Sequence, residues 1–456
     1  MDFVRWQSTN LYNGIIHEQK WLAWPGCLLF FLMLFSPTSY QPVKAVLLAF
    51  VLIMIGARAL ISGKFLLHPS IVFWTLLMVA TGFAFMLLGL VNNAPGATRV
   101  GTVYLLWPVV FAALLTEVRF KYVLDGIFKL LVFSSIVISL YSIYYLSYEI
   151  GWIPAELYFR FDFGQAVGFY KGHVEFNLYN IASFNFLLPF LFAMLLVKTK
   201  ELDFSISRIW IWFACGLAIF VAILTGRRAV WVVMLISPLV VIAIQMFKAR
   251  TFRIERSFIR LFIGFMIFVS LIFALDIHLF NLDILTLLGQ LVGGFDFSGG
   301  GSLIKEGGSL ISGGGASESV RAEQFFALLD GWQQNPLFGA GHGASAVGSL
   351  RDAEMPWAYE LSYVALLFQT GLVGFSIYCS GVIWIFWMGF KIIRSSHWLG
   401  FYMLPVLVGT FCFLIANATN PYLAKFDYMW VIFLPVALIN SYLLDKDKAS
   451  LLERKL

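Results

Sequence analysis

The chain has 456 residues, of which 60% are hydrophobic and only 12% are charged. Soluble globular proteins carry charge on about a quarter of their residues, so this composition excludes an ordinary soluble enzyme, and its apolar content also excludes a disordered chain. The net charge of +6 is typical of cytoplasmic loops that face anionic lipid, and it gives no reason to expect nucleic acid as a partner. The sequence therefore predicts a polytopic protein of the lipid bilayer.

Apolar runs about as long as one bilayer crossing recur along the chain and predict an all-α fold with about twelve transmembrane helices. We expect residues 1–456 to form a single integral membrane domain. The run at 359–389 is longer than one crossing, so we expect it to project past the membrane or to tilt. The predicted spans are 21–36, 43–62, 71–92, 99–116, 124–147, 178–198, 208–224, 228–247, 258–277, 359–389, 398–416 and 428–444.

The distribution of Lys and Arg along these spans predicts that both termini are cytoplasmic. The N-terminal segment, 1–20, lacks the apolar core of a signal peptide, and we expect none there. Lys44, Arg58 and Lys129 fall near helix ends, where long basic side chains snorkel to the interface. Seven further basic residues fall on the outer side against the orientation bias, which an anionic substrate would explain; they are Arg160, Lys171, Arg227, Arg228, Lys305, Arg321 and Arg351.

Two long segments are expected on the outer side, at 148–177 and at 278–358. The second contains a glycine-rich tract, 293–315, which favours a mobile lid or a tether and carries no phosphate-loop Lys-Ser/Thr ending. After this tract an apolar stripe predicts an amphipathic helix at about 318–333 that rests near the membrane surface. Asn335-Pro336 ends that helix.

Arginines are the first candidates for the functional site. The guanidinium group is a planar fork of donors that matches a diphosphate and stays charged at any relevant pH. Arg227 and Arg228 follow Gly226 at an expected outer turn, where an interface anchor is the alternative interpretation. Because adjacent helical residues point about 100° apart, we expect only one of the two to face a given cavity. Arg321 lies in the first turn of the predicted outer helix.

Two side chains are candidates for a general base. His342 lies between glycines in the segment 335–343 (NPLFGAGHG), and an imidazole titrates near neutral pH. A turn histidine bonded to the backbone is the alternative. Glu360 opens the apolar run that begins at Tyr359, where a carboxylate serves either as a helix cap or as a partly desolvated base.

The segment 148–177 offers a third cluster, in which charged side chains alternate with aromatic ones that could pack on sugar rings. An ordinary solvated loop with interfacial aromatics is an equal alternative. The candidates for binding the glycan or the acceptor, here and in the later loop, are Arg160, Lys171, His173, Arg351 and Tyr359. No metal-ligand spacing, nucleotide loop or hydrolase motif is present, so we expect neither a metal nor a cofactor.

Several short motifs together resemble the bacterial O-antigen polymerase and O-antigen ligase superfamily of membrane glycosyltransferases. They are 225–229 (TGRRA), Ser319-x-Arg321 leading into 335–343, 359–363 (YELSY) with 371–374 (GLVG), and 420–423 (NPYL). The resemblance covers about 150–450 by organisation. It implies a GT-C-like fold in the bacterial inner membrane, with the active site facing the periplasm.

The resemblance also implies an activity without cofactors. Members transfer a glycan from undecaprenyl diphosphate to another lipid-linked repeat unit (polymerases) or to lipid A–core (ligases); arginines hold the diphosphate and a base deprotonates the acceptor. A chain-length-regulating membrane protein is a candidate partner. Ligases carry His-Asn where this chain has Tyr359-Glu360, which favours a polymerase and passes the role of base to Glu360 or His342. A transporter or flippase of lipid-linked glycans remains an alternative, although we find no convincing internal repeat.

Overall fold

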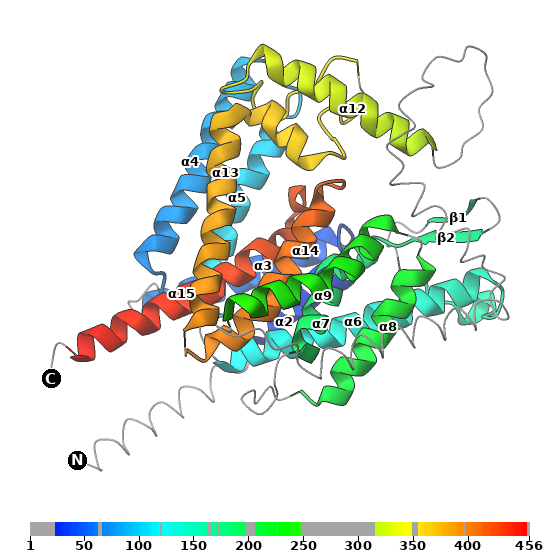
Figure 1. The fold of residues 1–456 in the computed structure, drawn as a ribbon, viewed down its shortest axis with the longest axis horizontal. Helices are drawn as coiled ribbons and strands as arrows, with labels where there is room; N and C mark the ends of the chain where they lie inside the picture. The colour runs from blue at the N-terminus through cyan, green and yellow to red at the C-terminus, as the bar shows by residue number, and fades with distance from the viewer. Residues whose placement is uncertain are drawn as a thin grey trace.

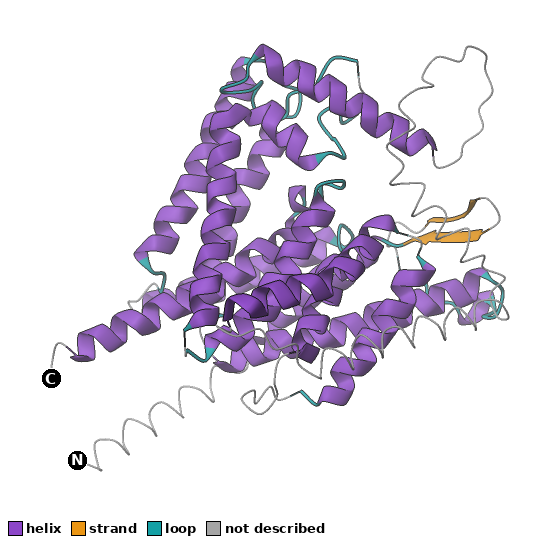
Figure 2. Cartoon of the chain, viewed as in Figure 1, coloured by secondary structure: helices purple, strands orange, loops and turns teal. Residues whose placement is uncertain are grey.

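The computed structural model shows a helical bundle that is compatible with a polytopic membrane protein (Figure 2). In the described part of the chain, eight helices are long and apolar enough to cross a membrane, and three shorter apolar helices accompany them. The predicted span 258–277 lies outside the described residues. The structure describes 23–62, 66–118, 121–161, 166–170, 173–196, 206–225, 227–248, 315–348, 354–395 and 397–453.

The helices follow the predicted spans closely, because lipid offers no partner for a free backbone amide and each apolar run pairs its amides internally. α8 has the predicted bounds, and the amphipathic helix expected at 318–333 is α12. In chain order the helices are α2 (Ala23–Phe35), α3 (Gln41–Ser62), α4 (Pro69–Val91), α5 (Ala97–Leu115), α6 (Lys121–Glu149), α7 (Phe184–Leu196), α8 (Arg208–Leu224), α9 (Arg228–Lys248), α12 (Gly315–Gln334), α13 (Ser362–Arg394), α14 (Leu399–Asn417) and α15 (Phe426–Glu453).

The segment predicted as a long outer loop at 148–177 contains regular structure that the sequence analysis did not expect. A short 3-10 helix, η2 (Ala155–Leu157), precedes two strands, β1 (Ala166–Tyr170) and β2 (His173–Asn177). The strands lie side by side and pair in antiparallel fashion (Figure 1). In the register of this pair Gly168 is opposite Glu175. A second 3-10 helix, η3 (Tyr179–Ser183), then leads directly into α7.

The helix α7 forms the centre of the bundle, and all 13 of its residues are buried. Apart from Asn185 the helix is apolar on every side, so it has no polar face that needs water and can be enclosed by its neighbours. α14, α9 and α8 all pack against it. This arrangement places Asn185, in the first turn of α7, deep in the molecule and directly after η3.

The helix α13 is broken at Gly371, whose backbone angles are φ 58° and ψ −169°. The backbone groups released by the break are paired by the segment between α12 and α13. Phe368 and Gln369 accept hydrogen bonds from Ala340 N and Gly341 N at 3.0 and 2.8 Å. Leu372 N and Val373 N donate to the carbonyls of Pro336 and Leu337 at 2.9 and 3.0 Å.

The sequence predicted one helix over the apolar run after Tyr359, whereas the structure breaks that run at Gly371 into two helical pieces. That the run projects past the membrane or tilts stays a prediction. Only glycine tolerates this backbone conformation, and a Cβ at Gly371 would collide with the backbone of Leu337. The run is long because it contains two helical pieces in succession. The hydrogen bonds at the break hold the segment 335–341 against α13.

An ion pair corrects the interpretation of Lys44 as a snorkelling residue. The Lys44 and Asp427 side chains are each only 1% exposed, and Lys44 Nζ lies 2.7 Å from Asp427 Oδ1. Lys44 Nζ also donates to Ser36 O at 2.7 Å. The second carboxylate oxygen of Asp427 accepts from Thr38 N and Gln41 Nε2, at 2.9 and 3.0 Å. The pair thus fastens the start of α3 to the start of α15, and both oxygens of the carboxylate find their partners inside the protein.

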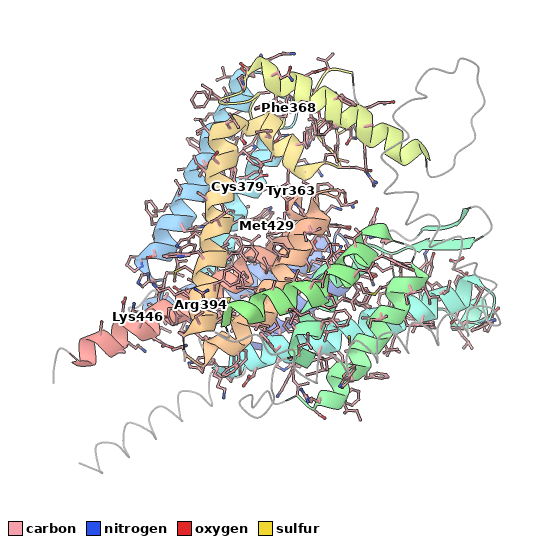
Figure 3. All side chains as sticks on the ribbon, viewed as in Figure 1. Tyr363, Phe368, Cys379, Arg394, Met429 and Lys446 are labelled. Atoms are coloured by element: carbon pink, nitrogen blue, oxygen red, sulfur yellow. The ribbon has the colours of Figure 1, made fainter. Side chains whose placement is uncertain are left out.

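The two ends of the bundle can be told apart by the residues that they carry. α12 packs on α13 near Phe368, at the end of the molecule that we call the α12 end. Arg394 and Lys446 lie at the opposite end (Figure 3). The α4–α5 connection also belongs to the α12 end, because Asn92 Nδ2 donates to Ala340 O there at 3.0 Å.

Candidate functional site

The candidate site at the α12 end begins with an ion pair between Arg321 and Glu360. Arg321 Nε lies 2.5 Å from Glu360 Oε2, and the two side chains are 32% and 11% exposed. Gln324, one turn after Arg321 on α12, accepts a hydrogen bond from Glu360 N at 3.1 Å. A single face of α12 therefore holds both the backbone and the carboxylate of Glu360, because residues three apart share one side of a helix.

This geometry bears on the alternative that Glu360 caps a helix. α13 begins at Ser362 with Leu361 at its N-cap, and its first turn contains no acidic residue. Glu360 lies before the helix, and its carboxylate meets the guanidinium group of Arg321. The ion pair thus offers a more direct account of the position of Glu360 than the helix dipole does.

Tyr422 lies close enough to both Arg227 and the Arg321–Glu360 pair to interact with the two arginines electrostatically. It lies in a 3-10 helix, η5 (Tyr422–Ala424), between α14 and α15, and its ring packs on Phe413 and Tyr428 with centroids 5.5 and 5.4 Å apart. Burial raises the pKa of Tyr422, and the positive charges of Arg227 and Arg321 oppose that rise. Both guanidinium groups therefore lie within electrostatic reach of one hydroxyl group.

The surroundings of Tyr422 are rigid. Leu423 N donates to Asn417 Oδ1 at 2.9 Å, which ties η5 back onto the end of α14. Tyr363, in the first turn of α13, donates from its hydroxyl to Leu414 O at 2.6 Å. Asn185 of the buried α7 lies beside the Tyr422 hydroxyl. The segments that carry Glu360 and Tyr422 are thus both attached to α14.

Arg227 directly precedes α9, and its carbonyl accepts from Val230 N and Trp231 N at 3.1 and 3.2 Å. It therefore occupies a fixed position at the helix start, close to Ala229, which packs against the same small apolar cluster as Tyr422 does. Arg228 is the first residue of α9, but its side chain lies outside the described residues. The expectation that only one of the two arginines faces a given cavity stays a prediction.

His342 lies apart from this cluster, in a fully buried position against α4, α5 and α13. Its ring stacks on Tyr104 at 4.3 Å, and its two nitrogens lie 3.3 Å from Gln369 Oε1 and 3.4 Å from Tyr378 Oη. His342 N donates to Phe85 O at 2.9 Å. Burial lowers the pKa of His342 to about 4, so the ring is neutral at neutral pH. This environment favours a structural role over the predicted role as a base.

The residues predicted to bind a glycan or an acceptor are less closely grouped. Tyr359 is 4% exposed and its hydroxyl accepts from Ala346 N at 2.5 Å, so it fixes the segment before Glu360. Arg160 is exposed in the segment after η2. His173 begins β2, but its side chain lies outside the described residues, as do the whole of Lys171 and Arg351.

Three residues of this arrangement were not predicted as site residues: Tyr422, Gln324 and Asn185. Tyr422 was within a recognised motif, 420–423, but nothing local distinguished its hydroxyl from those of the other tyrosines. Gln324 had a local signal, because it lies one turn after Arg321 on the same helix. Asn185 is a polar residue at the start of an apolar run, a pattern that indicates function in a membrane segment.

The cluster brings two guanidinium groups, one carboxylate, one phenol and two side-chain amides together at one end of the bundle. Such a set can bind an anionic group bidentately and can accept a proton beside it. No family model and no curated protein matches the chain. The chemistry of the cluster therefore has to be argued from its own residues.

Proposed function

We propose that the protein is an O-antigen or surface polysaccharide polymerase of the bacterial inner membrane, with both termini cytoplasmic and the α12 end in the periplasm. It transfers a glycan from undecaprenyl diphosphate to the non-reducing end of another lipid-linked repeat unit. The observation that carries the proposal is the convergence of Arg227 and Arg321 on Tyr422, with Glu360 paired to Arg321. The resemblance of these motifs to the polymerase and ligase superfamily supports it.

In this mechanism the two arginines bind the diphosphate of the donor. Their guanidinium forks match its oxygens and offset the negative charge that develops as the bond between the sugar and the diphosphate breaks. The phenol of Tyr422 is within electrostatic reach of both arginines and can donate a further hydrogen bond. Undecaprenyl diphosphate leaves with the electron pair of the broken bond.

Glu360 acts as the base that removes the proton from the acceptor hydroxyl, whose oxygen then bonds to the anomeric carbon. In the structure its carboxylate is paired with Arg321. When Arg321 turns to the diphosphate, the Glu360 carboxylate is released from this ion pair and can accept the proton of the acceptor hydroxyl. The arrangement thereby links deprotonation of the acceptor to the presence of a donor.

The placement of His342 supports a polymerase over a ligase. The ligase pattern uses a histidine at the position of Tyr359, and the nearby histidine of this chain is buried and neutral among Tyr104, Gln369 and Tyr378. Glu360 is then the one candidate base within the described part of the cluster.

One observation favours a second candidate, a transporter of lipid-linked glycans. Transporters commonly use discontinuous helices whose free backbone groups surround a substrate. α13 is broken at Gly371, but the freed groups are occupied by the segment 336–341, which keeps them from a ligand. The polymerase is therefore the better supported function.

The decisive experiment is a turnover assay with purified protein in detergent and a synthetic undecaprenyl-diphosphate repeat unit. A polymerase forms a ladder of longer glycans, whereas a transporter forms none and moves the lipid only across a sealed bilayer. Glu360→Gln keeps the size of the side chain and removes the basic oxygen, so we expect polymer formation to fall about 10²–10⁴-fold with folding intact. Glu354→Gln, at a nearby exposed position, is the matched control and should form the normal ladder. Normal polymer formation by Glu360→Gln would overturn the assignment of the base.

A further inference from the structure

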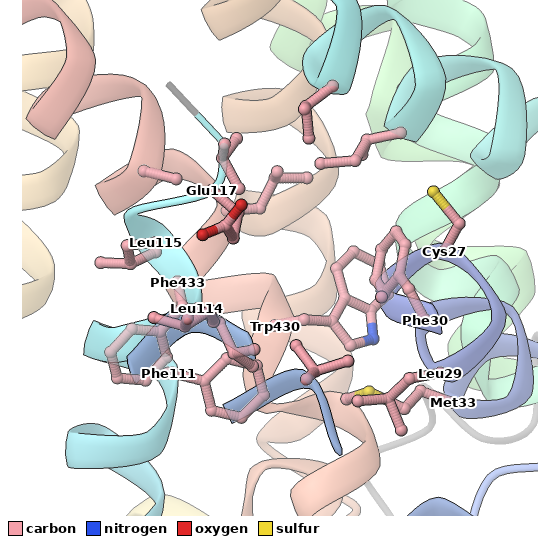
Figure 4. Close-up of a pocket in the computed structure, with 18 of the residues that line it drawn as sticks. Cys27, Leu29, Phe30, Met33, Phe111, Leu114, Leu115, Glu117, Trp430 and Phe433 are labelled. Carbon is pink, nitrogen blue, oxygen red and sulfur yellow. The ribbon is translucent and has the colours of Figure 1, made fainter. Parts of the chain in front are cut away.

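An apolar cavity of about 160 Å³ lies between α2, α3, α5, α6 and α15 (Figure 4). Aliphatic and aromatic side chains form nearly all of its wall, among them Phe30, Phe111 and Trp430. The charged residues that line it are Arg58 and Glu117, with Tyr122 beside them. No residue of the Arg227, Arg321 and Tyr422 cluster lines this cavity.

The polar side of the cavity lies at the end of the bundle opposite to the α12 end. Arg58 is near the end of α3 and Glu117 follows the end of α5, whereas α3 begins at the Lys44–Asp427 pair. With a rise of 1.5 Å per residue, Arg58 lies about 26 Å along α3 from Gln41. Arg58 Nη2 and Glu117 Oε1 are 2.5 Å apart, and the side chains are 22% and 29% exposed.

The mouth of the cavity is accessible and carries a positive charge. Lys121, the first residue of α6, is exposed next to the lining residue Tyr122. Lys121 thus adds a positive charge at the end of the bundle where the Arg58–Glu117 pair lines the cavity. A lipid phosphate at this end would be attracted by Lys121 and Arg58.

The geometry points to an anionic glycerophospholipid as the occupant, with part of one acyl chain inside the cavity and its phosphate near Lys121 and Arg58. An apolar wall of this extent favours an apolar group over water, and a volume of about 160 Å³ accepts several carbons of an acyl chain. Most of α3 is exposed in the bundle and faces the surrounding hydrocarbon, so acyl chains are already at the wall of the cavity. The proposed polyprenyl donor is a poorer fit, because its diphosphate would be at the opposite end.

The cavity offers a direct test through Trp430, which lines it and is only 3% exposed. The parent protein and Trp430→Phe are reconstituted into phosphatidylglycerol vesicles with brominated or unbrominated acyl chains. Bromine quenches indole fluorescence on contact, and the difference between the two proteins isolates Trp430 from the other tryptophans. We expect brominated chains to remove most of the Trp430 emission. Because the ring is buried, lipid on the outer surface does not contact it, and quenching therefore reports an acyl chain inside the cavity.

Glycine provides a matched pair of filling variants. Gly26 lines the cavity, and a Cβ there meets no atom within 4 Å, so this position has room for a side chain to begin and Gly26→Leu is the filling variant. Gly216 in α8 has the same free space but lies outside the cavity, and Gly216→Leu is the control. In each glycine variant, the emission of Trp430 is again obtained from the difference between the protein that contains Trp430 and its Trp430→Phe version. Quenching of this emission by brominated lipid should be lost in Gly26→Leu and kept in Gly216→Leu.

The charge at the mouth is tested with lipid head groups. The parent should show stronger Trp430 quenching by brominated phosphatidylglycerol than by brominated phosphatidylcholine, and Lys121→Gln should reduce that difference. Equal Trp430 emission in brominated and unbrominated vesicles would mean that no acyl chain enters. Two further results would overturn the proposal: quenching of Trp430 that persists in Gly26→Leu, and quenching of the parent that is equal with brominated phosphatidylglycerol and brominated phosphatidylcholine.

Discussion

At the scale of single residues, the candidate site depends most on Arg321. Its guanidinium group pairs with Glu360 and acts electrostatically on Tyr422, so one side chain connects the proposed base with the proposed diphosphate position. Gln324 holds Glu360 N independently of this pair. Loss of the guanidinium fork should therefore change the chemistry without releasing Glu360 from α12.

Arg321→Lys keeps the positive charge and loses the bidentate fork. Removing one well-placed donor of this kind costs about 10²–10³-fold in rate, and we expect kcat/KM for polymer formation to fall by that factor. Arg99→Lys changes an exposed arginine of α5 and is the control, with unchanged kcat/KM. Full polymer formation by the double variant Arg227→Lys, Arg321→Lys would contradict the diphosphate assignment.

His342 gives the protein a predictable dependence on pH. Its pKa is lowered from an ordinary value near 6.5 to about 4 because burial disfavours the charged ring. Above pH 6.5 the ring is neutral in both the folded and the unfolded chain, so His342 adds no pH dependence there. Between pH 6.5 and 4 only the unfolded chain is protonated, and the free energy of unfolding falls as the pH falls, by about 3 kcal/mol in total.

Thermal unfolding of the purified protein, followed between pH 7 and pH 4, measures this contribution. His342→Gln retains a polar side chain that does not titrate, so its midpoint should depend less steeply on pH over this interval. The same slope in both proteins would show that His342 is not the group responsible.

At the scale of helices, the sequence predicted where the helices lie in the chain, but it did not predict the break within α13 or the ion pair that connects α3 with α15. The bounds of α8 and α14 were predicted to within about one residue, because apolar runs end where polar residues begin. The break in α13 was missed, since Gly371 lies inside an apolar run and the groups that stabilise the break belong to a separate segment, 336–341. Lys44 was misread because its partner, Asp427, lies near the other end of the chain.

The Lys44–Asp427 pair should be a main stabilising link between α3 and α15. Lys44→Met leaves the Asp427 carboxylate buried and without its cation, and breaking such a pair costs about 3–5 kcal/mol. Combining it with Asp427→Leu removes the uncompensated charge and should recover part of that loss. The thermal midpoint in detergent measures both effects.

Lys129→Met is the matched control, because Lys129 is exposed on α6 and its replacement should leave the midpoint nearly unchanged. A double variant that is less stable than Lys44→Met would show that the hydrogen bonds of Asp427 to Thr38 N and Gln41 Nε2 outweigh the ion pair.

At the scale of the whole molecule, the candidate site combines segments that are far apart in sequence. Arg227, Arg321, Glu360 and Tyr422 come from the α8–α9 connection, from α12 and the segment after it, and from the α14–α15 connection. The sequence singled out three of the four by residue type and by charge on the unexpected side. Their grouping, and the inclusion of Tyr422, depend on how the helices pack, which local patterns do not encode.

The orientation of the molecule can be tested with single cysteines. The Lys/Arg bias predicts that the α12 end is outside, so Phe326→Cys, at a 61% exposed position on α12, should react with a membrane-impermeant thiol reagent in intact cells. Lys446→Cys, at the opposite end, should react only after the membrane is opened. The four native cysteines are first replaced by serine or alanine. The reverse labelling pattern would invert the topology and place the candidate site in the cytoplasm.

The complete enclosure of α7 has a consequence for how the protein is made. The helices α8, α9 and α14, which pack against α7, all follow it in the chain. The last of them, α14, is synthesised only near the end of translation. During that interval the newly inserted helix must rest against lipid tails. Its surface, which is apolar apart from Asn185 in the first turn, makes this possible, because hydrocarbon solvates such a helix about as well as protein does. The composition that lets α7 occupy the centre of the mature protein thus also lets it remain stable in the lipid bilayer before α8, α9 and α14 have been synthesised.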